Sequence, residues 1–201
     1  MPIIIDLLPL IGTLLVITTS FGLLINRDWR WMICLLGIQY IAVAMLTSPS
    51  WPLQMSIIKM IAGWMSSAVL GMAIASVAPD RGREDSFWPS GRLFRLLAAI
   101  MITAAVLSAV PTIGDLIPDL STTTLTGGMI LISLGLLHLG LTAQPFRISI
   151  GLLTLLAGFE IIYASVETSI LVAGLLAGVN IGLGLIGAYM ITAPELEQEY
   201  E

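Results

Sequence analysis

The chain has 201 residues, of which 57% are hydrophobic and only 10% are charged, and its formal net charge is −5. Roughly a quarter of the residues in soluble domains are charged, so this composition excludes a disordered chain and argues against a soluble globular domain. The acidic balance and the lack of a basic patch exclude the phosphate neutralisation on which nucleic-acid binding depends.

Long apolar runs follow one another along the whole chain. A run of about 18 apolar residues or more predicts a membrane-spanning helix. Helices are expected because every backbone group in hydrocarbon needs an internal hydrogen-bond partner. The sequence lacks the alternating apolar and polar residues that would indicate a β-barrel. The predicted fold class is therefore an all-α integral membrane protein with seven transmembrane helices. The expected spans are residues 7–25, 32–48, 54–77, 94–110, 127–143, 149–166 and 169–192.

Arginines occur only in or beside the first, third and fifth connections between the spans. They are Arg27, Arg30, Arg81, Arg83, Arg92, Arg95 and Arg147. With seven spans, all of these connections lie on one side, which the positive-inside rule identifies as cytoplasmic. We therefore expect the N-terminus outside and the C-terminus inside. The expected location is a bacterial or archaeal cytoplasmic membrane, with an organellar inner membrane as the alternative.

A shift of 121 residues aligns the first three spans with the last three. It places Gln39 on Glu160 and Lys59 on Asn180. The sequence thus allows two parallel three-helix units, and apolar helices can also align by chance. The expected units are an N-terminal unit (1–78), a loop and connector helix (79–124), a second three-helix unit (125–192) and an acidic tail (193–201).

Two ionisable residues, Lys59 and Glu160, lie deep inside the third and sixth spans. An ionisable group near the bilayer centre costs about 2.5–3.5 kcal/mol on insertion scales, so it normally faces a bundle interior with a partner. Such groups often mark proton or ion pathways. We therefore predict both residues to be proton-relay residues. The alternative is a static role, with Lys59 in a structural ion pair and Glu160 as a hydrogen-bonded carboxyl.

Other polar residues in the spans are candidates for the same relay. His138, in the fifth span, can either pack as a neutral side chain or exchange protons. Gln39 and Asn180 can extend a hydrogen-bonded chain, and Tyr163 shares a helix face with Glu160. These residues complete the predicted relay.

The remaining features predict packing rather than chemistry. Gly174, Gly178 and Gly182 have the spacing that lets helices approach closely. Cys34 lies in an apolar run and is predicted to be a small buried hydrophobe. A single cysteine excludes an intramolecular disulfide and a multi-cysteine metal site. No phosphate-binding loop or hydrolase motif is present, so we expect no catalytic centre, metal site or cofactor in this chain.

The segment from residue 134 to residue 165 carries a resemblance to a known family. It contains His138, then Arg147 in a short turn, then a helix with the motif Gly158-Phe159-Glu160. This pattern resembles the K subunit of respiratory complex I (chain 4L in mitochondria) and the C subunit of multisubunit Na⁺/H⁺ antiporters. The whole chain is similar to component E of membrane-bound energy-converting hydrogenases, in which Lys59 would match an intramembrane lysine.

This resemblance implies a membrane-arm subunit of a redox-driven complex that contributes to proton or Na⁺ translocation. The implied partners are antiporter-like membrane subunits and peripheral redox subunits, which would carry the redox cofactors. One position departs from the K-subunit pattern: its second membrane glutamate has no counterpart here, where the last span carries Asn180. The alternatives are a subunit of a cation/proton antiporter, a stand-alone transporter and a purely structural subunit.

Overall fold

The computed structural model of the protein describes residues 2–77, 91–116 and 120–199. In this part of the chain the backbone forms seven α-helices and no strand. All seven helices are long and apolar enough to cross a membrane, which confirms the predicted all-α, multi-pass membrane fold. The helices are α1 (Pro2–Ile25), α2 (Trp29–Thr47), α3 (Leu53–Ser76), α4 (Arg92–Gly114), α5 (Thr122–Gly140), α6 (Pro145–Tyr163) and α7 (Ile170–Glu199).

The breaks between the helices carry local signals that start the next helix. Asp28 caps α2, where its side chain accepts a hydrogen bond from the backbone N–H of Arg30 at 3.0 Å. Ser121 caps α5 in the same way and accepts from the N–H of Thr124 at 3.2 Å. Pro145 lies in the first turn of α6, where a missing N–H breaks no helical hydrogen bond. These signals fold the chain back and forth across the membrane.

Two helices continue beyond the ends that the hydropathy pattern predicts. α4 runs through Pro111 to Gly114, and α7 continues past residue 192 to Glu199. Residues 195–199 are Glu, Leu and Gln, all of which favour a helical backbone. Helix propensity therefore extends α7 after its apolar run has ended.

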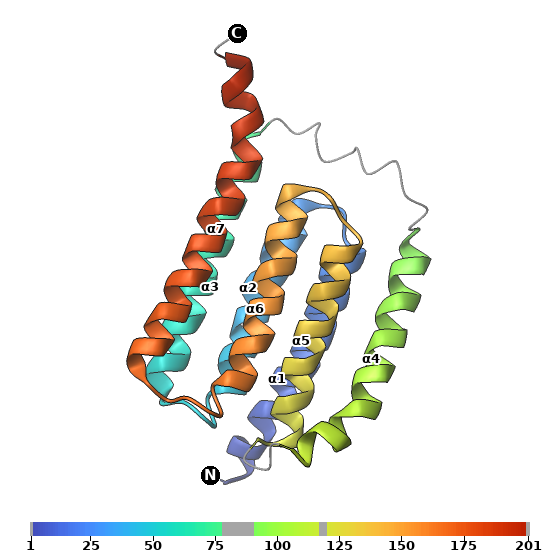
Figure 1. Ribbon diagram of the computed structural model, residues 1–201, viewed down its shortest axis with the longest axis vertical. Helices are drawn as coiled ribbons and strands as arrows, with labels where there is room; N and C mark the ends of the chain where they lie inside the picture. Colours follow the sequence, from blue (N-terminus) through green and yellow to red (C-terminus); the bar gives the residue numbers. More distant parts are fainter. Residues whose placement is uncertain (1, 78–90, 117–119, 200–201) are drawn as a thin grey trace.

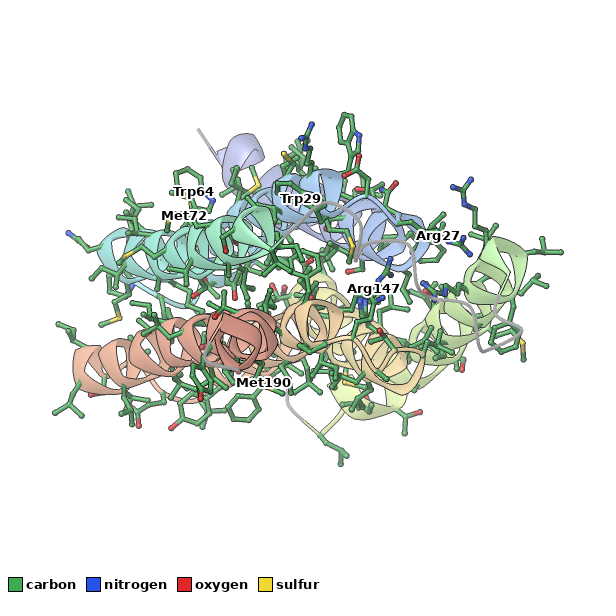
Figure 2. The ribbon with its side chains drawn as sticks, turned by 90° about the horizontal axis from the view of Figure 1, so that it is seen from above. Arg27, Trp29, Trp64, Met72, Arg147 and Met190 are labelled. Atoms are coloured by element: carbon green, nitrogen blue, oxygen red, sulfur yellow. The ribbon has the colours of Figure 1, made fainter. Side chains whose placement is uncertain are left out.

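The seven helices form two layers (Figures 1 and 2). α1, α2 and α3 make one layer, and α5, α6 and α7 make the other. Across the layers α1 packs on α5, α2 on α6 and α3 on α7, while α4 packs on α5 and α1 at one edge. Facing helices run in the same direction (Figure 1). The apolar core between the layers includes Leu36, Leu46, Leu134 and Ile150.

The order of the helices bears on the 121-residue alignment. Units related by a two-fold axis along the helices would place α1 opposite α7, whereas α1 packs on α5. Equivalent helices of the two units instead face each other, and Lys59 and Asn180, which the alignment equates, both bond to the opposite layer. The duplication itself stays a prediction.

All described arginines lie at one end of the bundle, as the loop pattern predicts. They are Arg27, Arg30, Arg92, Arg95 and Arg147, and we call this end the basic end. Arg81 and Arg83 lie outside the described residues. Figure 2 views the bundle from the basic end and shows Arg147 among the helices, with Arg27 at the periphery.

Cys34 is exposed on the outer surface of α2, so the prediction that it is buried was wrong. The apolar residues around it indicate depth in the membrane and not direction. Lipid tails are as apolar as a protein core, so a small hydrophobe is equally stable on the lipid-facing side of a helix.

Glycines allow α5 and α6 to approach closely. A Cβ on Gly158 would lie 2.7 Å from the carbonyl oxygen of Gly128, and a Cβ on Gly135 would lie 2.8 Å from the backbone nitrogen of Leu155. Backbone atoms cannot move aside as the end of a side chain can. Only glycine therefore fits at these two positions.

The three glycines predicted to pack helices, Gly174, Gly178 and Gly182, do not do so within the described chain. Nothing lies within 4 Å of the positions that their Cβ atoms would take. α7 instead meets α3 at Gly184, where a Cβ would lie 2.9 Å from the Cα of Ser66. A spacing of four shows that residues share a helix face, but not which way that face points. The prediction was wrong for contacts inside this chain.

We expect Gly158→Val to destabilise the bundle relative to Gly178→Val. Overpacking a close helix contact costs about 1–3 kcal/mol, and the Gly158 position meets backbone atoms. Both substitutions improve helix propensity by the same amount, so the difference between them isolates the packing cost. The measurement is the unfolding midpoint of the two variants in mild detergent. Equal midpoints would show that the α5–α6 contact is not as tight as described.

Candidate functional site

A buried ion pair joins the two layers of the bundle. The Nζ of Lys59, on α3, contacts the Oε2 of Glu160, on α6, and the two side chains are 2% and 0% exposed. Thirteen residues separate Glu160 from Arg147 on α6, which places the pair about 20 Å from the basic end along the helix. Both residues are predicted separately from the sequence, and the structure brings them into contact.

The ion pair continues into a hydrogen-bonded chain. Asn180, on α7, donates from Nδ2 to the Oε1 of Glu160 at 3.2 Å, and its Oδ1 accepts from the hydroxyl of Tyr40, on α2, at 2.9 Å. We call Tyr40, Asn180, Glu160 and Lys59 the buried polar chain. It links four helices from both layers. Because the amide nitrogen and the amide oxygen of Asn180 each have their own partner, the orientation of this side chain is defined.

Tyr40 was missed by sequence reasoning. It is 1% exposed and lies in the middle of an apolar span, where a phenol hydroxyl must find a partner. This requirement could have marked Tyr40 as a member of a buried polar site, but it does not identify the hydrogen-bond partner. Asn180 is 140 residues further along the chain.

The chemistry of the pair follows from its isolation. Each buried charge loses several kcal/mol of hydration, so the pair persists only because charge contact and hydrogen bonds compensate for that loss. Asn180 supplies the second interaction of the Glu160 carboxylate. Adding a proton to this carboxylate removes the charge that holds Lys59. Proton binding at Glu160 and the position of the Lys59 ammonium are therefore coupled.

His138 lies elsewhere, in the last turn of α5 at the basic end. A Cβ on Gly151 would meet the Cδ2 of Leu139 at 2.9 Å, which places His138 level with this part of α6. Glu160 is nine residues further along α6, or about 13 Å. His138 is therefore not a direct neighbour of the ion pair.

Two other predicted relay residues do not join the buried polar chain directly. Gln39 is 1% exposed, and neither its Oε1 nor its Nε2 has a hydrogen-bond partner among the described residues. An unsatisfied buried polar group costs about 1–3 kcal/mol. Tyr163 stacks on Phe159, with ring centroids 5.5 Å apart, and Phe159 is exposed on the outer side of α6.

A second buried polar cluster occupies the basic end. Arg95 donates to the carbonyl oxygen of Leu24 at 3.4 Å, and Arg147 donates to that of Asn26 at 3.1 Å. These carbonyls lie at the C-terminus of α1, where helical acceptors are left over and positive charge is stabilising. His138 lies within the electrostatic reach of both arginines. The arginines thus tie α4 and α6 to the end of α1.

No group of three or more His, Cys, Asp and Glu side chains that could hold a metal ion occurs among the described residues. The buried polar chain itself consists of a carboxylate, an ammonium group, an amide and a phenol hydroxyl, all of which can donate or accept hydrogen bonds. No protein-family model, curated protein or solved structure matches the sequence. The candidate site rests on the geometry of Lys59, Glu160, Asn180 and Tyr40.

Proposed function

We propose that the protein is a membrane-arm subunit of a complex I-related or energy-converting hydrogenase-type complex, in which it contributes to coupled proton or Na⁺ translocation. Glu160 and Lys59 are the proton-handling pair, and Asn180 and Tyr40 hold the carboxylate in place. Electrons are handled by partner subunits, which are peripheral redox proteins and antiporter-like membrane proteins. The basic end faces the cytoplasm, with the N-terminus outside and the C-terminus inside.

The observation that carries this proposal is the buried ion pair with its hydrogen-bonded extension. Intramembrane ionisable residues are expensive, and those that persist usually mark a proton or ion path. The pair can exist as two charges or, after a proton shift from Lys59 to Glu160, as two neutral groups. A charge that arrives on a neighbouring subunit would bias this balance, which is the step that coupling requires.

Two alternatives make different predictions. In a purely structural subunit the ion pair only joins the layers, and neutral side chains of similar size would replace it without loss of ion movement. A stand-alone transporter normally has interrupted helices at its substrate site. In the described residues, α3, α6 and α7 pass Lys59, Glu160 and Asn180 as continuous helices, which favours a subunit over such a transporter.

Purification from native membranes in mild detergent, with mass spectrometry of the proteins that co-migrate, tests the proposed assembly. We expect large antiporter-like subunits together with iron–sulfur or nickel–iron proteins. Antiporter-like subunits without redox proteins would indicate a cation/proton antiporter instead. A chain that migrates alone, or only with copies of itself, would overturn the proposal.

A further inference from the structure

Buried polar atoms without a hydrogen-bond partner gather in one part of the interior. Apart from the ion pair, those in the described chain belong to Ser20, Gln39, Arg95 and His138, and each side chain is at most 7% exposed. Buried polar groups are nearly always hydrogen-bonded, and internal water supplies the partners that the protein does not. These four residues therefore lack, within the described chain, the partners that internal water normally supplies.

The packing of three helices brings Ser20 and Gln39 to within about one helical turn of each other along the bundle. Thr13 of α1 and Leu46 of α2 both meet Gly127 of α5, where a Cβ would lie 3.4 Å from the Oγ1 of Thr13 and 2.6 Å from the Cδ1 of Leu46. Residues seven apart share a helix face. Seven residues towards the basic end, or about 10 Å, these faces carry Ser20, Gln39 and Leu134.

The level of Leu134 lies between those of Glu160 and His138. His138 is four residues beyond Leu134 on α5, or about 6 Å nearer the basic end. On α6, a Cβ on Gly158 would lie 2.7 Å from the backbone nitrogen of Ile132. Glu160 is two residues further from the basic end than Gly158, and Ile132 is two residues further from it than Leu134. Glu160 therefore lies about 6 Å from the level of Leu134, on the side away from the basic end. Each interval is about the length of two hydrogen bonds that meet at one water molecule.

The side chains along this line suit proton transfer. A hydroxyl, an amide and a neutral imidazole each both donate and accept hydrogen bonds. Ser20, Gln39 and His138 can therefore each hold a water molecule from either side. Tyr40, the neighbour of Gln39 in sequence, is bonded to Asn180 of the buried polar chain. Helix α2 therefore carries one residue of the row Ser20, Gln39 and His138 and one residue of the buried polar chain.

The opposite end of the bundle is nearer to the ion pair but is closed. Thr13 donates to the carbonyl oxygen of Thr123 at 3.0 Å, and Thr47 donates to Ser56 at 3.1 Å. Trp51 donates through its indole N–H to the carbonyl oxygen of Glu167 at 2.9 Å. Trp51 also packs in a buried apolar cluster with Met55, Ala164 and Ala173. The polar side chains named here are satisfied by protein, and the apolar cluster around Trp51 lies among them.

We propose that the Lys59–Glu160 pair exchanges protons with the basic end only, through water molecules held by Gln39, Ser20 and His138. The inference rests on the proposed function for the use of these protons, but the water path itself does not depend on it. A proton that arrives through the path binds the Glu160 carboxylate and releases Lys59. The pair therefore has access to one side of the membrane in the described conformation.

Exchange of a cysteine S–H group tests whether water reaches the line. Cys34 is the single cysteine of the chain, so Cys34→Ser provides a background in which Ser20→Cys or Thr13→Cys is the sole thiol. The measurement is the rate at which the S–H infrared band of the purified protein, taken as the difference from the Cys34→Ser background, converts to S–D in D₂O. We expect Ser20→Cys to exchange about tenfold faster than Thr13→Cys, because only Ser20 lies on the water path.

Static burial predicts the reverse order, since Ser20 is 2% exposed and Thr13 is 8% exposed. Equal rates, or faster exchange at Thr13→Cys, would overturn the water path whatever the protein does. This readout needs no translocation activity, so it separates a failure of the path from a failure of the proposed function.

A second experiment, which measures ion translocation, tests whether the water path is used. Gln39→Leu removes the polar atoms from the line, and we expect it to slow translocation by the intact complex about tenfold with assembly unchanged. Gln39→Met serves as a second variant if Leu does not assemble. The matched control is Thr47→Val with Ser56→Ala on the closed side, which should translocate at the parental rate. Normal translocation by Gln39→Leu and Gln39→Met, or equal losses in the control, would overturn one-sided access.

Discussion

A chain that carries both Lys59→Met and Glu160→Gln should assemble into its complex but should not support ion translocation. The double change leaves no buried charge without a partner, and the Gln side chain can still accept the hydrogen bond from Asn180. A positioned group that gives and takes protons contributes about 100-fold or more to a transfer step, so we expect a loss of at least that size. The measurement is the proton gradient formed by native vesicles per electron transferred.

The double variant separates the two main interpretations of the pair. A purely structural ion pair predicts parental translocation, because the neutral replacement keeps the layers together. A relay predicts that translocation is lost from a complex of normal subunit composition. Normal pumping by the double variant would therefore refute the proposed function, and loss of the whole complex would show that the pair is needed for assembly.

Lys59→Met alone should be the most destabilising single substitution in the described core. It leaves the Glu160 carboxylate, which is 0% exposed, without its counter-charge. Removing one partner of a buried ion pair costs about 3–5 kcal/mol, whereas neutral replacement of both partners is often close to neutral. We therefore expect the double variant to recover most of the stability that the single variant loses. Unfolding in mixed detergent micelles measures the three free energies.

A matched control for this cycle is Lys59→Met combined with Thr154→Val. Thr154 is buried on the same helix as Glu160 and carries no charge, so it cannot relieve the unpaired carboxylate. The two effects should add, as they do for independent sites. Recovery by Thr154→Val, or no recovery by Glu160→Gln, would mean that the described pairing is not the source of the instability.

Sequence reasoning identified three of the four residues in the buried polar chain, because charge and amide groups inside an apolar run are conspicuous. Lys59, Glu160 and Asn180 each carry a cost that demands a partner. Tyr40 is amphipathic, so its presence in an apolar helix is a weaker signal of a buried polar site than a charged or amide side chain. His138 and Tyr163 share the polar signal of the relay, but His138 belongs to the basic end and Tyr163 stacks on Phe159.

The direction in which a side chain points from its helix was predicted less well than the helix itself. Gly174, Gly178 and Gly182 are spaced four apart and face outward, whereas Gly135 and Gly158, each seven residues from another glycine of its helix, lie against backbone atoms of the facing helix. Cys34 likewise faces outward. In each case the predicted helix is present, and the direction of the side chain was not predicted.

The amino-acid sequence by itself determined the seven membrane-crossing helices and the gathering of the described arginines at one end. Both follow from local transfer energies, since twenty apolar residues favour hydrocarbon and arginine favours the interface whatever surrounds them. Only the tertiary structure decided that Lys59 meets Glu160 and that Tyr40 meets Asn180, 140 residues away. Lipid and protein interior are equally apolar, so hydrophobicity cannot tell the inner face of a helix from the outer one. That choice depends on close packing and on the pairing of polar groups between distant helices.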